Sequence, residues 1–121
     1  MTVDEWDVYV VNEVRDWIDG LDEAAHARVV QAIDLLAENG PGLGRPLVDT
    51  IQRSSVANLK ELRAGTVRIL FVFDPWRSSI LLVAGDKAGQ RSSWYRDAIP
   101  LAEQRYEVYL KERVREEGGQ P

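Results

Sequence analysis

The feature that most constrains the fold is a pair of continuous apolar runs, ILFVF at residues 69 to 73 and ILLVA at residues 80 to 84. A strand with one face in water alternates apolar and polar residues, whereas a strand without that alternation is buried on both faces. The two runs are therefore expected to be strands near the centre of a sheet. The segment DPWR at residues 74 to 77 supplies turn residues that join them as an antiparallel hairpin.

Further strands are expected before this hairpin. Residues 59 to 64 follow a period of two, and the Ala64-Gly65 break joins them to a strand over residues 67 to 73. The strand after the DPWR turn is expected over residues 79 to 85, which completes an antiparallel meander. Near the start of the chain, VDEWDVYV at residues 3 to 10 contains alternating β-formers and predicts a first strand.

Helical spacing begins at residue 11. Apolar residues three or four positions apart line one side of two segments: Val14, Trp17, Ile18 and Leu21 in the first, and Val29, Val30, Ile33, Leu36 and Ala37 in the second. Gly20 is a stop signal for the first helix, Asp22 is placed to cap the second, and NGP at residues 39 to 41 ends it. Because the break between them is so short, the two helices are expected to form an αα-hairpin.

The remaining segments complete the expected fold. Residues 40 to 58 contain three glycines, two prolines and little periodicity, so they predict an ordered surface loop. A last helix is indicated by Leu101, Ala102, Tyr106, Tyr109 and Leu110, with Pro100 favouring a fresh helix start. The order β-α-α-β-β-β-α predicts a small α+β domain over residues 1 to 115, with one mostly antiparallel four-stranded sheet and a frayed tail at residues 116 to 121.

Charge is distributed unevenly along the chain. The formal net charge of −5 argues, taken whole, against a nucleic-acid partner. Between residues 58 and 97, however, seven basic residues face four acidic ones, while the rest holds eight basic against sixteen acidic. One part of the chain can therefore contact an anion while the remainder stays acidic.

Several kinds of chemistry are excluded. The chain contains no cysteine and one histidine, and it shows no zinc pattern and no P-loop, so neither a metal nor another cofactor is expected. The start is acidic where a signal peptide is basic, and no apolar run approaches the roughly 20 residues that span a bilayer. A cytoplasmic protein without membrane contact is therefore expected. Any catalysis has to use Arg, Lys, Tyr and carboxylates.

The ordered set of motifs resembles a known family. NLKELRAGTVRILFVFD at residues 58 to 74, SILLVAGDKAG at residues 79 to 89 and a tyrosine near the last helix resemble the RelE/HigB superfamily of bacterial toxin–antitoxin toxins. The likeness is strongest to its HigB-like, phage-derived branch, where a GPxLGRPxVD-type loop precedes an ELR strand. It covers nearly the whole chain, from about residue 8 to residue 110.

The resemblance implies a twisted antiparallel sheet, an N-terminal helical hairpin and a groove between the sheet and the C-terminal segment. It also implies a ribosome-dependent endoribonuclease that cuts translated messenger RNA by metal-independent attack of the 2′-hydroxyl on the scissile phosphate. The implied partners are the ribosome, its message and a HigA-like antitoxin with a helix-turn-helix domain. Operator DNA would be bound only through that antitoxin.

Three residues match the family positions for catalysis. Arg68 corresponds to the strand arginine at the scissile phosphate, and a guanidinium fork suits two phosphate oxygens. Lys87 follows the fourth strand, where the family places a basic residue at the groove. Tyr95 matches the tyrosine beside the scissile phosphate, as stacking platform or proton-transfer partner. Each has a structural alternative. Arg68 would form an ion pair with Glu61 or Asp74, Lys87 would be a solvated turn lysine, and Tyr95 would anchor the last helix to the core.

Lys60, Arg63, Arg91 and Trp94 are candidate RNA contacts. Arg63 and Glu61 alternate onto one strand face, so a charge pair that braces the hairpin is the competing interpretation for Arg63. The competing interpretation of Arg91 is an exposed arginine without a function. For Trp94 it is an anchor of the last helix. Some RelE members carry lysines on this strand where Glu61 stands, and either Glu61 or Lys60 is left as a substitute for the missing base.

A non-catalytic alternative also fits the acidic balance and the departure at Glu61. On the same fold, the chain would be a binding protein, either a ParE-like inhibitor of DNA gyrase or an inert phage-derived interaction module. A structural partner of a DNA-binding neighbour is the third interpretation.

Overall fold

The structure is a computed structural model that describes residues 5–88 and 91–116, without the side chains of residues 91 and 92. Its elements follow in the order β1 (Asp7–Val10), α1 (Asn12–Asp19), α2 (Glu23–Asn39), the 3-10 turn η1 (Gly40–Gly42), β2 (Val48–Thr50), β3 (Lys60–Ala64), β4 (Val67–Phe73), β5 (Ser78–Asp86) and α3 (Arg91–Glu116). Of the tail expected at residues 116 to 121, Glu116 belongs to α3 and the rest lies outside the described residues.

One sheet organises the molecule, with strand order β1-β5-β4-β3-β2. The two continuous apolar runs form β4 and β5, which pair antiparallel beside the centre, as their lack of alternation predicts. β1 pairs with β5 in parallel at one edge. The α+β class and the mostly antiparallel sheet are confirmed.

The sheet has five strands, not four, because part of the loop expected at residues 40 to 58 forms β2. This strand pairs antiparallel with β3, and Val48 lies opposite Leu62. Three residues are too few to show a period of two, so only the partner strand identifies β2 as a strand. β2 brings Asp49 opposite Glu61, which bears on the site described below.

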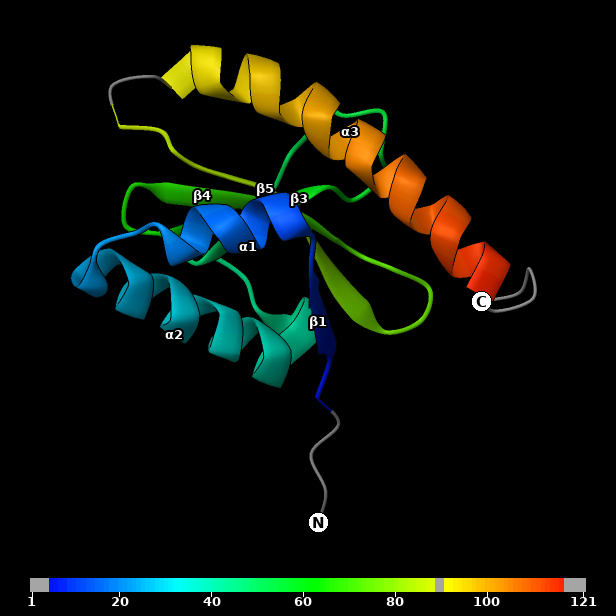
Figure 1. Cartoon of the computed structure of the whole chain (residues 1–121), viewed down its shortest axis with the longest axis horizontal. Helices are drawn as coiled ribbons and strands as arrows, with labels where there is room; N and C mark the ends of the chain where they lie inside the picture. Colours follow the sequence, from blue (N-terminus) through cyan, green and yellow to red (C-terminus); the bar gives the residue numbers. More distant parts are fainter. Residues whose placement is uncertain (1–4, 89–90, 117–121) are drawn as a thin grey trace.

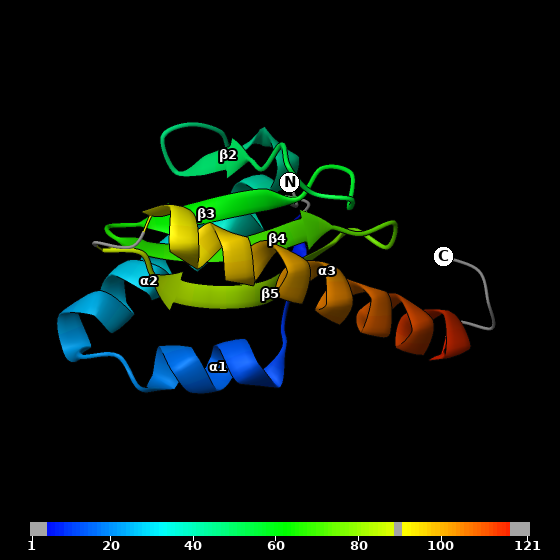
Figure 2. The same ribbon diagram turned by 90° about the horizontal axis from the view of Figure 1, so that it is seen from above.

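Helices cover both faces of the sheet: α1 and α2 pack on one and α3 crosses the other (Figures 1 and 2). On the first face Val14, Ile18, Val29 and Leu36 join the buried side chains of the strands. Asp22 caps α2 as expected, with Oδ1 accepting a hydrogen bond from the Ala25 N–H at 2.8 Å. The apolar stripe on α2 is narrower than the sequence predicts, because Val30 is 40% exposed.

The long helix α3 corrects the expected helix start at Pro100. It begins at Arg91 and carries Pro100 inside. An interior proline removes a backbone hydrogen bond and costs about 3 kcal/mol or more. Ala98, Ile99 and Ala102 are buried against the sheet while Pro100 is exposed, so packing on both sides of the proline holds the helix together.

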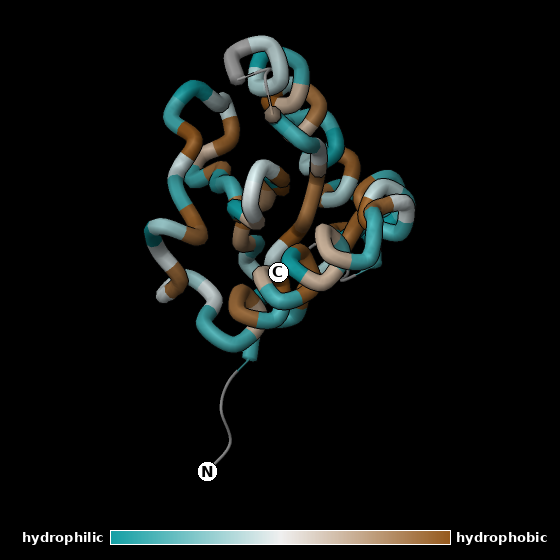
Figure 3. The backbone as a smooth tube through the Cα atoms, turned by 90° about the vertical axis from the view of Figure 1, so that its left-hand side faces the viewer, coloured by the Kyte–Doolittle hydropathy of each residue, from teal (hydrophilic) through white to brown (hydrophobic). Residues whose placement is uncertain are grey.

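Hydrophilic and hydrophobic residues are interspersed along the backbone of the helices (Figure 3). Within the described part of the chain, no helix combines the length and the apolar character needed to cross a bilayer.

Candidate functional site

Glu61 is the centre of a cluster of polar side chains between the sheet and α3. It lies in β3 and is only 4% exposed. Its Oε1 accepts a hydrogen bond from the Tyr95 hydroxyl at 2.5 Å, and its Oε2 accepts from Arg63 Nη2 at 2.8 Å and Nε at 3.1 Å. A buried carboxylate is tolerated only when it is paired and hydrogen-bonded in this way. The bond to Tyr95 joins residues that are 34 positions apart in the chain.

Arg68 lies beside Glu61, with Nε 3.8 Å from Glu61 Oε1 and a side chain that is 11% exposed. Its Nη1 donates to the carbonyl oxygens of Gly65 at 2.6 Å and Val67 at 3.0 Å, at the turn of the β3–β4 hairpin. Its Nε is buried and has no hydrogen-bond partner. A buried donor without an acceptor costs about 1 to 3 kcal/mol, so this atom needs an explanation.

The structure decides which carboxylate accompanies Arg68. Asp74, the other candidate, accepts from the backbone N–H of Trp76 at 3.0 Å and of Ser78 at 2.8 Å, and from the Tyr109 hydroxyl at 2.6 Å. That carboxylate organises the turn between β4 and β5 and anchors α3. The neighbour of Arg68 is therefore Glu61, as one of the two structural alternatives proposed.

The surroundings fix the protonation state of the tyrosine in the cluster. Burial raises the pKa of the Tyr95 phenol, and the hydrogen bond to Glu61 raises it further. The bond to Glu61 likewise raises the pKa of the Arg63 guanidinium. At neutral pH Tyr95 is therefore a hydrogen-bond and proton donor rather than a phenolate base.

Arg63 pairs with Glu61 two positions away on β3, as one interpretation of the sequence held, and it reaches β2 as well. Its Nη2 lies 3.2 Å from Asp49 Oδ2. The pKa of the Asp49 carboxyl is lowered, first by the Thr50 N–H and then by Arg45 and Arg63. Since Asp49 belongs to the strand that the sequence did not reveal, only the β2–β3 pairing identifies this contact.

The structure does not bring all the predicted residues together. Strand alternation places Lys60 with Leu62, on the sheet face opposite Glu61, and its Nζ donates to Thr50 Oγ1 at 3.1 Å. Lys87 follows β5 and its backbone N–H donates to the Thr66 carbonyl at 3.1 Å. Register sets Arg68 opposite Gly85, two positions before Lys87, so both basic residues belong to the same end of the sheet.

Trp94 acts as an anchor of α3. A Cβ atom built on Gly85 would lie 2.2 Å from Trp94 Nε1, so the indole packs directly on the β5 backbone. The ring contacts Tyr95 edge to face at 5.0 Å between centroids.

The side chain of Arg91 lies outside the described residues. The cluster therefore holds Arg63, Arg68 and Tyr95 of the seven predicted residues.

A cleft of about 290 Å³ adjoins the cluster and contains residues that the sequence did not single out. It is lined by Arg53, Tyr95, Arg96, Ile99, Pro100 and Glu103. Arg96 follows Tyr95 directly, a position that could have drawn attention to it. Arg53 lies in an aperiodic segment and carries no sequence signal.

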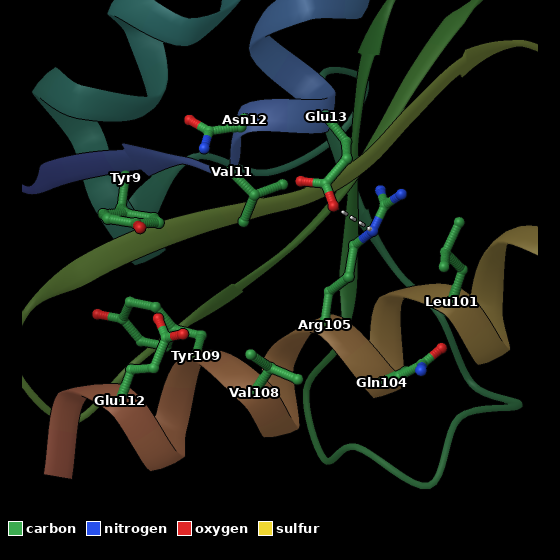
Figure 4. A pocket seen from close by; sticks show the side chains of 10 residues that line it. All are labelled: Tyr9, Val11, Asn12, Glu13, Leu101, Gln104, Arg105, Val108, Tyr109 and Glu112. Atoms are coloured by element: carbon green, nitrogen blue, oxygen red, sulfur yellow. Dashed lines mark ion pairs between the residues drawn. The ribbon is translucent and has the colours of Figure 1, made fainter. Parts of the chain in front are cut away.

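A second groove, of about 410 Å³, lies between β1, the start of α1 and α3 (Figure 4). Leu101 and Val108 of α3 and Tyr9 of β1 line it and are 37%, 51% and 48% exposed. Arg105 forms an ion pair with Glu13 in this groove, with Arg105 Nε 3.9 Å from Glu13 Oε2 (Figure 4). Apolar and polar side chains both line this groove, and its charged residues are Glu13, Arg105 and Glu112. In the described part of the chain, no group of three or more His, Cys, Asp or Glu residues is arranged to hold a metal ion.

Comparisons with known proteins agree with the fold. Residues 16–107 match the family described as "Phage derived protein Gp49-like (DUF891)". Two relatives in Mycobacterium tuberculosis (strain ATCC 25618 / H37Rv) are similar over 105 residues. "Putative toxin HigB3" is 51% identical, over 85% of this chain and 92% of the relative. "Putative toxin HigB2" is 45% identical, over 83% of this chain and 52% of the relative, so the match spans about half of that protein.

Among solved structures, the archaeal RelE–RelB complex from Pyrococcus horikoshii OT3 contains a similar chain. The TM-score is 0.57 at 19% identity, over 69% of this chain and 96% of that one. At this identity the likeness concerns the fold alone.

Proposed function

Because this chain belongs to the phage-derived Gp49-like family, within the RelE/HigB toxin superfamily, we propose that it is the toxin of a type II toxin–antitoxin module. Its activity is that of a ribosome-dependent endoribonuclease, which cuts translated messenger RNA by attack of the 2′-hydroxyl on the neighbouring phosphate. The identity of 51% to a protein named as a HigB toxin supports the first statement. The polar cluster around Glu61 supports the second.

The observation that carries the catalytic proposal is the unpartnered Nε of Arg68 beside the Tyr95–Glu61 pair. A phosphate oxygen supplies the acceptor that this buried donor lacks, and charge-assisted bonds of a guanidinium to phosphate are strong. Since the Tyr95 hydroxyl donates to Glu61 Oε1, which lies 3.8 Å from Arg68 Nε, a phosphate bound at Nε also lies beside this tyrosine.

The cluster contains the groups that the reaction needs. Glu61, rather than Lys60 on the opposite face, takes the proton of the attacking 2′-hydroxyl, and the 2′-oxygen bonds to phosphorus. The bond from phosphorus to the 5′-oxygen breaks, and Tyr95 donates a proton to the leaving oxygen and regains one from Glu61. Arg68 stabilises the charge that develops on the phosphate oxygens. We assign the same role to Lys87, which lies outside the cluster but at the same end of the sheet as Arg68. The products are a 2′,3′-cyclic phosphate and a 5′-hydroxyl.

The partner in this proposal is an antitoxin made from the same operon. The similar chain in the solved RelE–RelB complex supports an antitoxin as the partner class. We assign it a HigA-like helix-turn-helix domain, through which alone the complex contacts operator DNA. The toxin acts in the cytoplasm, where ribosomes translate the message.

A second function is favoured by one feature of Arg68. Two of its hydrogen bonds go to carbonyl groups of its own hairpin, which is the arrangement of a structural arginine. On this account the protein is a non-catalytic inhibitor on the same fold, such as a ParE-like inhibitor of gyrase.

Inducible expression in a bacterial host tests the proposal. Wild type, Arg68→Ala and the control Arg15→Ala, which changes an exposed arginine of α1, are compared by mapping messenger 5′ ends within minutes. New ends at fixed codon positions are expected for wild type and Arg15→Ala and not for Arg68→Ala. Growth arrest with intact messages and stalled gyrase–DNA complexes would support the second function. Equal cleavage by Arg68→Ala would refute the assignment of this residue.

A further inference from the structure

The cleft of about 290 Å³ beside Tyr95 lies between the loop after β2 and the first half of α3. Tyr95 belongs to both places: its hydroxyl bonds to Glu61 in the cluster, and the residue also lines the cleft. A strand that passes the cluster on this side therefore enters the cleft next.

Two cations of the cleft have no side-chain partner among the described residues. Arg53 and Arg96 are both exposed, and neither guanidinium makes an ion pair or a hydrogen bond to another described residue. Arg45, Arg63 and Arg105, in contrast, are each paired with a carboxylate. The two guanidiniums are thus available to an anion from outside.

The acidic residue of the cleft is already occupied. Glu103 Oε2 accepts from the Ser54 hydroxyl at 2.7 Å and from the Ser55 N–H at 2.8 Å. These bonds lower the pKa of the Glu103 carboxyl, so it is ionised and held at neutral pH. They tie the loop that carries Arg53 to α3, which carries Arg96.

The loop is also fixed internally. The backbone N–H of Ile51 donates to the Leu59 carbonyl at 2.8 Å, and that of Val56 donates to the Ser54 hydroxyl at 3.0 Å. Arg53 is therefore presented from an ordered turn. Ordered presentation matters because less conformational entropy is lost on binding.

The rest of the cleft suits a sugar and a base. Pro100 is exposed and Ile99 forms part of the apolar lining. The half-buried ring of Tyr95 offers an aromatic surface, and single-stranded RNA is recognised largely by stacking on such surfaces. Cation pair, apolar lining and aromatic ring together match one nucleotide with its phosphate.

We propose that this cleft is a second nucleotide subsite, in which Arg53 and Arg96 bind the phosphate that neighbours the scissile one in a single RNA strand. The inference rests on the proposed function and names a further part of its binding site. Guanidinium forks match phosphate oxygens in geometry and charge. In the groove on the other side of α3, the one arginine, Arg105, is already paired with Glu13.

The test compares two double variants with the same change in charge. Arg53→Gln/Arg96→Gln removes the proposed contacts, and Arg15→Gln/Arg115→Gln removes two other exposed arginines, one in α1 and one in the last turn of α3. The probe is a uridine hexanucleotide with 2′-O-methyl groups, which is not cleaved. It is titrated to millimolar concentration into ¹⁵N-labelled protein, and the arginine Nε–H signals are followed by NMR at several salt concentrations.

Four results are expected. The signals of Arg53 and Arg96 shift with RNA in the wild type. Arg53→Gln/Arg96→Gln binds about tenfold more weakly, because charge-assisted bonds are lost. Its salt slope falls by about 0.7 for each phosphate contact removed. Arg15→Gln/Arg115→Gln binds like wild type.

Signals that stay in place, or equal binding by the two double variants, would overturn the subsite. Loss of antitoxin binding with unchanged RNA binding would overturn it too, and would make the cleft a protein contact. Cleavage of ribosome-bound message by the same variants separates this failure from that of the proposed function. If Arg68→Ala is inactive while Arg53→Gln/Arg96→Gln cleaves like wild type, the function stands without the subsite.

Discussion

One helix supplies two surfaces of opposite chemistry. On the side of β3 and the loop after β2, α3 carries Tyr95 and Arg96 and borders a cleft with two arginines that have no side-chain partner among the described residues. On the side of β1 and α1, it carries Leu101 and Val108 and borders a groove in which Arg105 is paired with Glu13 and Glu112 is a further carboxylate. The first side therefore offers two guanidiniums to a phosphate, whereas the arginine on the second side is already paired.

The two sides are also fastened differently, although each uses a tyrosine bound to a carboxylate. Tyr109 donates to Asp74, which is otherwise held by two backbone N–H groups of a turn. Tyr95 donates to Glu61, whose other neighbours are the guanidiniums of Arg63 and Arg68. In the first arrangement the carboxylate is satisfied by the backbone of a turn, and the one guanidinium, that of Arg113, donates to the Tyr109 hydroxyl at 3.1 Å. In the second arrangement the Glu61 carboxylate is surrounded by guanidiniums, which also bind phosphate. Under the proposed function, an RNA phosphate competes with Glu61 for these guanidiniums.

The largest effect is expected from Glu61→Gln, which removes the charge at the centre of the cluster. Two guanidiniums then lose their buried counter-charge, and the free energy of unfolding falls by about 2 to 4 kcal/mol. Cleavage falls at least 100-fold, because the proton acceptor is lost. Urea unfolding and single-turnover cleavage on programmed ribosomes measure the two effects.

Asp49→Asn is the control for that variant, since it removes a more exposed partner of Arg63 and leaves Glu61 in place. It should lose much less stability and keep its activity. If Asp49→Asn and Glu61→Gln had the same effect, Glu61 would not be the centre of the cluster.

Next in size is the contrast between Tyr95→Phe and Tyr109→Phe. Each substitution removes one hydrogen bond to a carboxylate and should lower the free energy of unfolding by about 1 to 2 kcal/mol. Only Tyr95→Phe should also reduce the cleavage rate, by about 10 to 100-fold, because it alone removes a proton donor from the reaction. Equal activities of the two variants would show that the Tyr95 side is as structural as the Tyr109 side.

Alkaline pH gives a smaller effect that both sides share. The pKa values of Tyr95 and Tyr109 are raised in the folded state, first by burial and then by their carboxylate partners. Above the unfolded pKa of about 10, the unfolded chain binds fewer protons than the folded one, so stability falls as pH rises. Below that pH the contribution is fully present.

Urea midpoints from pH 8 to 11 measure this loss. In Tyr95→Phe/Tyr109→Phe the fall above pH 10 should be shallower than in the wild type. A parallel fall in both proteins would mean that other groups control the alkaline transition.

The smallest effect is expected on the apolar side. Leu101→Ser/Val108→Ser changes side chains that are partly exposed, so stability should change by about 0.5 kcal/mol or less per site. Cleavage of ribosome-bound message should be that of wild type. A loss of cleavage without a loss of stability would place this groove in contact with the ribosome or its message and would end the functional contrast between the two sides.

The sequence alone determined the elements whose signals are local. Continuous apolar runs identified β4 and β5, three- and four-residue spacing identified α1 and α2, and Asp22 marked the cap between them. The pairing of Arg63 with Glu61 was also within reach of the sequence, because alternation on one strand puts positions two apart on the same face.

Only the tertiary structure decided the rest, because the deciding contacts join distant segments. β2 is a strand through its partner β3, and α3 continues through Pro100 because buried neighbours on both sides hold it to the sheet. Tyr95 reaches Glu61 across 34 positions, and Arg53 faces the same cleft as Arg96 because Glu103 ties its loop to α3. Local patterns report a residue's own element and face, whereas a site depends on which faces meet.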